Sequence, residues 1–130
     1  MFEVQNHPER FVMELRFSGL VRGPEIAEAF AAYATISQFY KGKPHMLIAD
    51  MRGMAPLPPE LAEKMMEAIA YGREHGVVFC VHLSDTGIVR LQSRRLAAEA
   101  DPRGHGTMVE VDSLEEAWRQ IDARELSKAS

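Results

Sequence analysis

Two short apolar runs of the same design limit how this chain can fold. They occupy residues 44–53 and residues 76–85. The first is stopped by Asp50, Arg52 and Gly53, and the second ends at Asp85. Neither run has a helical period, and a run of this length between proline, glycine and aspartate is typical of a buried β-strand that opens onto a loop. A segment with helical spacing follows each run, so the sequence predicts two consecutive strand–helix units.

The remainder of the chain extends this alternation. Residues 10–18 alternate between apolar and polar side chains and predict a strand, which residues 2–5 join across a tight turn as an antiparallel neighbour. Residues 106–111 predict a further parallel strand. Helical spacing is found in residues 24–41, 59–75, 86–100 and those that follow Ser113. We therefore predict an α/β fold with four helices, a mostly parallel sheet of about five strands and an N-terminal antiparallel strand.

Polar side chains at alternate positions of three predicted strands indicate how the sheet is covered. They are Glu14 on one strand, His82 on another and Glu110 on the last. Strands of a sheet that is covered by helices on both faces are apolar throughout. We therefore expect the helices mainly on one face, and we hypothesise that Glu14, His82 and Glu110 mark a second face that forms a shallow groove or a dimer interface.

The composition is that of an ordinary globular protein. A length of 130 residues fits one domain, residues 1–130, in which residues 126–130 are expected to fray. A net charge of -4 gives no broad basic surface for nucleic acid, and no apolar run approaches the ~18 residues that cross a bilayer. Cys80 is the only cysteine, and the N-terminus lacks the pattern of a signal peptide. We therefore expect a cytoplasmic protein that does not bind nucleic acid or span a membrane.

No arrangement of residues predicts catalysis, a metal site or a cofactor. The five histidines form no His-x-x-x-His pair, and the sequence contains neither Cys-x-x-Cys, nor Gly-x-Ser-x-Gly, nor a phosphate-binding glycine loop. Cys80 and His82 share one face of a predicted strand, which would suit a thiolate–imidazole pair, although any strand places alternate residues on one face. We therefore predict that the protein is not an enzyme.

Candidate residues for binding a partner or ligand lie where the two apolar runs end, because ligands of open α/β sheets bind outside the carboxyl ends of the strands. They are Asp50, Arg52, Met54, Ser84, Asp85, Thr86 and Arg90. An alternative for the two aspartates is structural, with Asp50 capping loop amides and Asp85 capping a helix.

A group of methionines beside the proline-rich residues 55–59 permits a second kind of site. The group consists of Met51, Met54, Met65 and Met66. Unbranched thioether side chains adapt to irregular spaces, so these residues could line an apolar pocket. Filling of the core explains most of the group equally well.

Three short motifs, in their order along the chain, resemble the SpoIIAA-like (STAS) superfamily. They are Phe17-Ser18-Gly19 before the first predicted helix, Leu47-Ile48-Ala49-Asp50 on the next strand, and Ser113-Leu114-Glu115-Glu116-Ala117-Trp118 near the end. The likeness spans residues 2–122 and is greatest for an uncharacterised bacterial branch grouped with both STAS and CRAL-TRIO lipid-binding domains. It implies a superhelix of strand–helix units whose parallel strands follow one another in chain order.

The resemblance also implies a regulatory role. Typical members are anti-sigma factor antagonists that are switched by phosphorylation of a serine where the second helix begins, but residues 54–60 of this chain contain no serine or threonine. Our leading hypothesis is a non-enzymatic bacterial signalling module without that switch, which binds a partner protein or a second copy of itself through residues 50–58 and 84–90. The alternative is CRAL-TRIO-like binding of a small apolar or anionic ligand.

Overall fold

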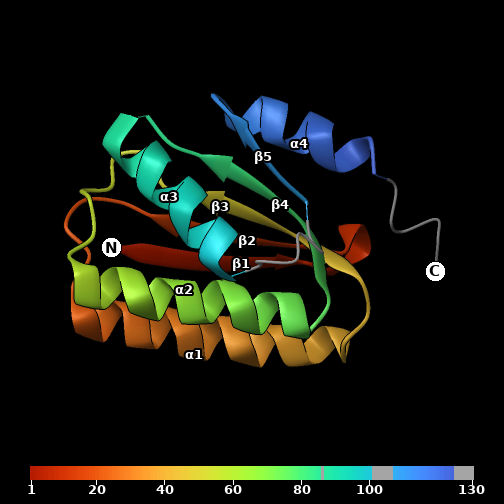
Figure 1. The fold of residues 1–130 in the computed structure, drawn as a ribbon. Coiled ribbons are helices and arrows are strands. Elements are labelled where there is room, and N and C mark those ends of the chain that lie inside the picture. The colour runs from red at the N-terminus through yellow and green to blue at the C-terminus, as the bar shows by residue number, and fades with distance from the viewer. Residues whose placement is uncertain (86, 101–106, 125–130) are drawn as a thin grey trace.

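A computed structural model describes residues 1–85, 87–100 and 107–124 of the chain. The expected fraying of residues 126–130 falls outside this described part. Figure 1 shows the elements within it, which follow the order β1 (Phe2–His7), a short 3-10 turn η1 (Pro8–Arg10), β2 (Val12–Phe17), α1 (Gly23–Tyr40), β3 (His45–Asp50), α2 (Pro59–Glu74), β4 (Val77–Leu83), α3 (Gly87–Ala100), β5 (Thr107–Val111) and α4 (Leu114–Asp122).

The strands of the described part form one sheet in the order β1-β2-β3-β4-β5. β1 runs antiparallel to β2, with Phe2 opposite Phe17, and the other neighbours are parallel. The carboxyl ends of β3, β4 and β5 lie side by side at one end of the sheet, where Asp50, Leu83 and Val111 are in register. The predicted α/β fold, with an antiparallel N-terminal strand and strands in chain order, is therefore confirmed.

Helices α1, α2 and α3 lie on one face of the sheet, and α4 lies on the other face over β3, β4 and β5 (Figure 1). The alternation of side chains along β3 explains this division. Leu47 packs with Tyr33 of α1, whereas the next residue, Ile48, packs with Ile121 of α4. The expectation that the helices lie mainly on one face is confirmed for the described part of the chain.

The polar residues of the strands do not mark an open second face. His82 is 5% exposed and lies beneath α3, where its ring is hydrogen-bonded to the Ser93 hydroxyl. Glu110 is next to His82 on the same face and forms an ion pair with Arg94 of α3. Of the three predicted markers, only Glu14 lies on the α4 side. The hypothesis was wrong because α3 supplies polar partners at positions that strand alternation assigned to water.

Two helix features follow directly from the sequence. α1 ends at Tyr40 and is capped by Lys41, whose φ is 50°. Gly42 follows with a φ of 78°, a left-handed conformation that glycine adopts without strain. At Gly72, a Cβ atom would lie 2.0 Å from the Tyr33 hydroxyl oxygen, so the missing side chain lets α2 approach α1 closely. No helix of the described part is long and apolar enough to cross a bilayer.

Candidate functional site

The loops after β3 and β4 lie together at the carboxyl end of the sheet. The backbone N–H of Gly53 donates to the two carboxylate oxygens of Asp85, at 3.1 and 3.0 Å. Just after β3, the N–H of Met51 donates to the carbonyl oxygen of Leu83 at 2.8 Å. The structure thus brings the two predicted groups of site residues to one end of the molecule, where the Asp85 carboxylate joins their loops.

Asp50 and Arg52 form an ion pair on the α4 side of the sheet. Nε and Nη2 of Arg52 donate to the carboxylate of Asp50 at 3.0 and 2.8 Å, and the backbone N–H of Arg52 donates to it at 3.1 Å. Burial by itself would raise the pKa of Asp50, but these hydrogen bonds and the charges of Arg52 and Arg16 outweigh it and hold the pKa below its ordinary value. The interpretation that Asp50 caps a loop amide is therefore confirmed.

Arg90, in the first turn of α3, connects the ends of β4 and β5. Its Nη2 donates to the Ser84 carbonyl oxygen at 2.9 Å and to the Asp112 carboxylate at 3.2 Å. Its Nε lies 3.3 Å from the Ser84 hydroxyl oxygen and 3.3 Å from the Glu110 carboxylate. These contacts fix the direction of the guanidinium group and pair its charge.

The remaining predicted site residues are Met54 and Thr86. Met54 turns inward, is 4% exposed, and its backbone pairs with that of Gly19 in the connection between β2 and α1. Thr86 lies outside the described residues. The polar members of the predicted set are therefore engaged mainly with one another and with the loops, and their roles in binding stay predictions.

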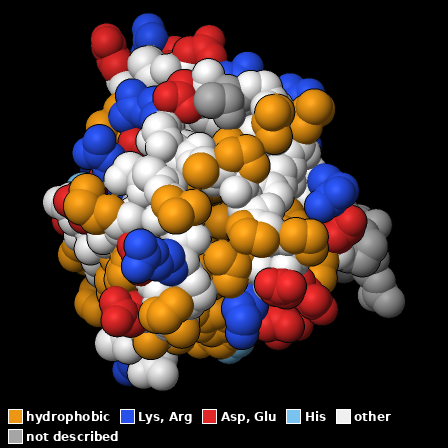
Figure 2. Space-filling view, turned by 90° about the vertical axis from the view of Figure 1, so that its left-hand side faces the viewer, with side chains coloured by type: hydrophobic (Ala, Val, Ile, Leu, Met, Phe, Trp, Pro, Cys, Tyr) orange, Lys and Arg blue, Asp and Glu red, His pale blue; other side chains and the backbone are white. Residues whose placement is uncertain are grey.

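Exposed apolar side chains gather at the same end of the molecule, which Figure 2 views directly. Leu20 is 66%, Ile88 68% and Leu91 65% exposed, and Pro56 and Pro58 are exposed as well. We call these five residues the apolar rim. The interaction surface hypothesised from the sequence, residues 50–58 and 84–90, includes Pro56, Pro58 and Ile88 of the apolar rim but not Leu20 or Leu91.

Hydrogen bonds hold the segments of the apolar rim together. The N–H of Gly19 donates to the Gly53 carbonyl oxygen at 2.9 Å, and the N–H of Ala55 donates to the Gly19 carbonyl oxygen at 3.0 Å. The Gln92 side chain of α3 accepts from the Leu57 N–H at 3.0 Å and donates to the Leu57 carbonyl oxygen at 2.8 Å. The connection before α1, the loop before α2 and helix α3 therefore form one ordered surface.

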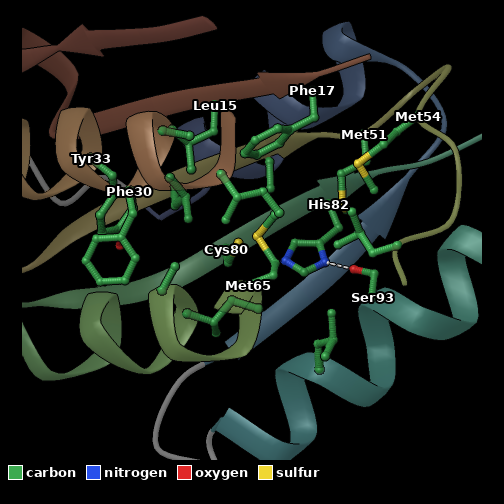
Figure 3. A pocket seen from close by; sticks show the side chains of 18 of the residues that line it. Leu15, Phe17, Phe30, Tyr33, Met51, Met54, Met65, Cys80, His82 and Ser93 are labelled. Carbon is green, nitrogen blue, oxygen red and sulfur yellow. Dashed lines mark hydrogen bonds between the residues drawn. The ribbon is translucent and has the colours of Figure 1, made fainter. Parts of the chain in front are cut away.

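An apolar cavity of about 80 Å³ lies between the sheet and the inner sides of α1, α2 and α3 (Figure 3). Its wall includes Leu15, Phe17, Leu47, Ala49, Phe30, Ala68, Val89 and Leu96. Three of the four methionines that the sequence suggested for a pocket, Met51, Met54 and Met65, line it. Met66 does not; it packs against the neighbouring core instead.

His82 and Ser93 form a polar pair in the wall of this cavity. The Ser93 hydroxyl is hydrogen-bonded to Nδ1 of His82, and Figure 3 shows the ring beside Cys80 and Met65. Burial lowers the pKa of His82 to about 4 and raises the pKa of Cys80 to about 12, so both are neutral at pH 7. A thiolate–imidazolium pair is therefore disfavoured. The sequence analysis did not single out Ser93. Its only sequence signal is that it is a polar residue within the inward stripe of α3 that runs from Val89 to Leu96.

Metal-binding residue types do not cluster in the described part of the chain. No three His, Cys, Asp or Glu side chains there lie close enough together to hold a metal ion. The cavity wall contains the His82 imidazole, the Ser93 hydroxyl, the protonated Cys80 thiol, the Tyr33 hydroxyl and the Gln92 amide, which are uncharged, and the Arg73 guanidinium, which carries a positive charge. What this arrangement can do chemically is to surround a mainly apolar molecule and donate or accept a few hydrogen bonds.

Comparison with solved structures identifies the same fold in a crystal structure of an anti-sigma factor antagonist from Mycobacterium paratuberculosis. The TM-score is 0.62 at 13% sequence identity, and the match covers 94% of this chain and 93% of that chain. No protein-family model matches the sequence, and no curated protein is significantly similar to it. The fold predicted for this chain is thus shared with that antagonist.

Proposed function

We propose that this chain of SpoIIAA-like fold is a non-enzymatic regulatory module that binds a partner protein through the apolar rim. The observation that carries the proposal is the exposure of three large aliphatic side chains, Leu20, Ile88 and Leu91, at the carboxyl end of the strands. Large apolar groups gathered on a surface and bordered by polar residues are typical of protein-binding sites.

The rigidity of the rim supports this proposal. Its three segments are joined by backbone hydrogen bonds and by Gln92, so little conformational freedom remains to be lost when a partner binds. The ion pairs of Arg52 and Arg90 place fixed charges beside the apolar residues, as in the polar border of an interface. Residues 54–60 carry no hydroxyl side chain, so partner binding through this rim is not switched by phosphorylation there.

The partner-binding proposal is tested by charge substitution on the rim. Tagged wild-type protein, Ile88→Glu and Phe39→Glu are expressed in the native host, and captured proteins are quantified by mass spectrometry. Phe39 is a matched control, because it is 60% exposed but lies at the far end of α1. A partner should be captured by the wild type and Phe39→Glu and be lost with Ile88→Glu. Equal capture by all three proteins would remove the rim from consideration.

A second candidate function is binding of a small apolar ligand, and the methionine-lined cavity favours it. Met51, Met54 and Met65 have flexible, unbranched side chains, which suit a site that opens for a ligand. Organic extracts of the purified protein, analysed by mass spectrometry, should contain a small apolar molecule. The variant Ala49→Leu, which adds three carbon atoms to the cavity wall, should release it. An extract that is identical for both proteins would argue against this function.

A further inference from the structure

We infer that the cavity selects an uncharged molecule whose single polar group hydrogen-bonds to Nε2 of His82. This inference rests on the second proposed function, that the cavity takes a small apolar ligand, and it names the chemistry of that ligand. It starts from the few polar side chains that line the cavity, which are Arg73, Cys80, His82, Gln92 and Ser93, with the Tyr33 hydroxyl.

Most of these polar groups already have partners. Both ends of the Gln92 amide bond to the Leu57 backbone, and the Ser93 hydroxyl bonds to Nδ1 of His82. Arg73 donates to the Val77 carbonyl oxygen at 3.4 Å. Nε2 of His82 has no hydrogen-bond partner among the described residues, and the ring belongs to the cavity wall. A ligand group that hydrogen-bonds to Nε2 in these mainly apolar surroundings gains affinity.

The imidazole offers the ligand a hydrogen bond and no charge. His82 is neutral, because burial penalises its protonated form. A neutral ring offers one lone pair or one N–H at Nε2, depending on which way the Ser93 bond is oriented, and either one is complementary to a hydroxyl group. A carboxylate or an ammonium group would lose its hydration against Leu47, Ala49 and Val89 without gaining an opposite charge from His82. The positive charge in the wall is that of Arg73, whose guanidinium already donates to the Val77 carbonyl oxygen.

The size of the cavity limits the ligand to a few atoms. Its volume of about 80 Å³ is smaller than the ~150 Å³ of an engineered apolar cavity that binds benzene. A single ring therefore requires movement of the flexible lining, which Met51, Met54 and Met65 supply from three positions. The geometry therefore points to a compact alcohol or phenol, with its apolar body among the methionines and its hydroxyl at His82.

The test compares phenol with toluene, which has nearly the same shape but no hydroxyl group. Binding to the full chain is measured by calorimetry, and the imidazole nitrogens are followed by NMR after ¹⁵N-histidine labelling. Phenol should bind about 3- to 10-fold more tightly than toluene, the gain expected from one net hydrogen bond. Phenol, unlike toluene, should also shift the Nε2 resonance of His82, a readout that needs no substitution.

Three variants separate this inference from the function on which it rests. Ala49→Leu should abolish binding of both probes, whereas Ala27→Leu, the same change on the exposed side of α1, should alter neither. His82→Leu should remove the preference for phenol while toluene still binds.

If wild-type protein binds phenol and toluene equally and Nε2 is unaffected, the inference is overturned and the cavity function stands. If wild type binds neither probe better than Ala49→Leu does, both are overturned. Tighter binding of benzoate than of phenol would also overturn the inference.

Discussion

Single residues in this fold keep one protonation state because their surroundings differ. Asp50 is 2% exposed and stays ionised beside Arg52, while His82 is also buried and stays neutral beside a serine. His45 is completely buried, and burial lowers its pKa, against a smaller opposite effect of its hydrogen bond to the Lys43 carbonyl oxygen. The ionised Asp50 and the neutral buried histidines therefore affect the stability of the fold in different ways.

Removing the Asp50 carboxylate should cost more stability than removing its more distant partner. Asp50→Ala leaves the Arg52 guanidinium and backbone N–H without their acceptor, and we expect the free energy of unfolding to fall by about 1–3 kcal/mol. Arg16 is 58% exposed and 4.0 Å from Asp50, so Arg16→Ala should cost less than about 1 kcal/mol. Urea denaturation of both variants measures this, and equal losses would contradict the assigned geometry.

Acidification should destabilise the protein through its buried histidines. Burial lowers the pKa of His82 from 6.5 to about 4, so between these values the unfolded chain binds a proton that the folded protein does not. The free energy of unfolding should therefore fall as the pH falls from 6.5 to 4, by on the order of 3 kcal/mol, with no further loss from this group below pH 4. His45 acts in the same direction.

Chemical denaturation at a series of pH values measures this dependence. His82→Phe removes the titrating group but keeps a ring in the cavity wall, so its stability should decline less steeply between pH 6.5 and 4. The same decline in the variant and the wild type would show that His82 does not contribute. The other histidines are common to both proteins, so their contributions cancel in the comparison.

Residue-level prediction from the sequence succeeded where the partner is local and failed where it is distant. The role of Asp50 was predictable, because the amide and guanidinium that it binds belong to Arg52, two positions later. The partners of His82 and Glu110 come from α3, and the sequence alone does not state which turn of a helix will cover which strand residue. The polar residues at alternate strand positions were therefore wrongly predicted to face water.

At the scale of elements, the contact between α1 and α2 depends on the absence of a side chain at Gly72. Alanine favours a helix over glycine by about 1 kcal/mol. At this position, however, its Cβ would lie 2.0 Å from the Tyr33 hydroxyl oxygen and 3.3 Å from Val77. We expect the clash to prevail, so Gly72→Ala should lower the free energy of unfolding by about 1–3 kcal/mol.

Removing the nearest obstructing atom should rescue this variant. Tyr33→Phe deletes the hydroxyl oxygen that the added methyl group would meet, so Gly72→Ala combined with Tyr33→Phe should recover most of the loss in thermal unfolding. Ala68→Gly, one turn earlier on α2, provides a control in which helix propensity alone predicts a destabilisation. A stabilised Gly72→Ala protein would mean that α2 lies farther from α1 than the structure has it.

Element boundaries were largely predictable because turn-forming residues mark them. Gly42 follows the end of α1, Pro59 opens α2, and the Ser113 hydroxyl accepts from the Glu116 N–H at the start of α4. The face that each helix covers was harder to predict. The position of α4 on the other side of the sheet depends on packing of Ala117 and Ile121 against Ile48 and its neighbours, which a helical stripe does not specify.

For the whole molecule, the layered sheet predicts a gradient of local stability. Ile48 of β3 and Val81 of β4 are completely buried between the two helical layers, and both strands have neighbours on each side. β1 and β5 are the edges of the sheet. Amide hydrogen exchange should therefore be slowest in β3 and β4 and faster in β1 and β5. Slower exchange in β5 than in β3, measured by mass spectrometry, would contradict this arrangement.

The fold was predictable at this scale, whereas the candidate sites were predictable only in part. Strand–helix alternation and a run such as Leu47-Ile48-Ala49 determine a parallel sheet, whatever the exact packing. The apolar rim depends on the rotation of α3, which leaves Ile88 and Leu91 outward, and the cavity depends on how closely three helices approach the sheet. Neither quantity is encoded in local spacing.

Neighbours in this sheet are also successive strands in the chain, and this order has a kinetic consequence. From β2 onward, the two strands of each parallel pair are joined directly by the chain segment between them. No strand from elsewhere in the sequence has to be inserted between two paired strands. Chain connections of modest length lower the entropic barrier to pairing. Assembly can therefore advance from the amino end as the polypeptide leaves the ribosome, with β5 and α4 completing the structure last.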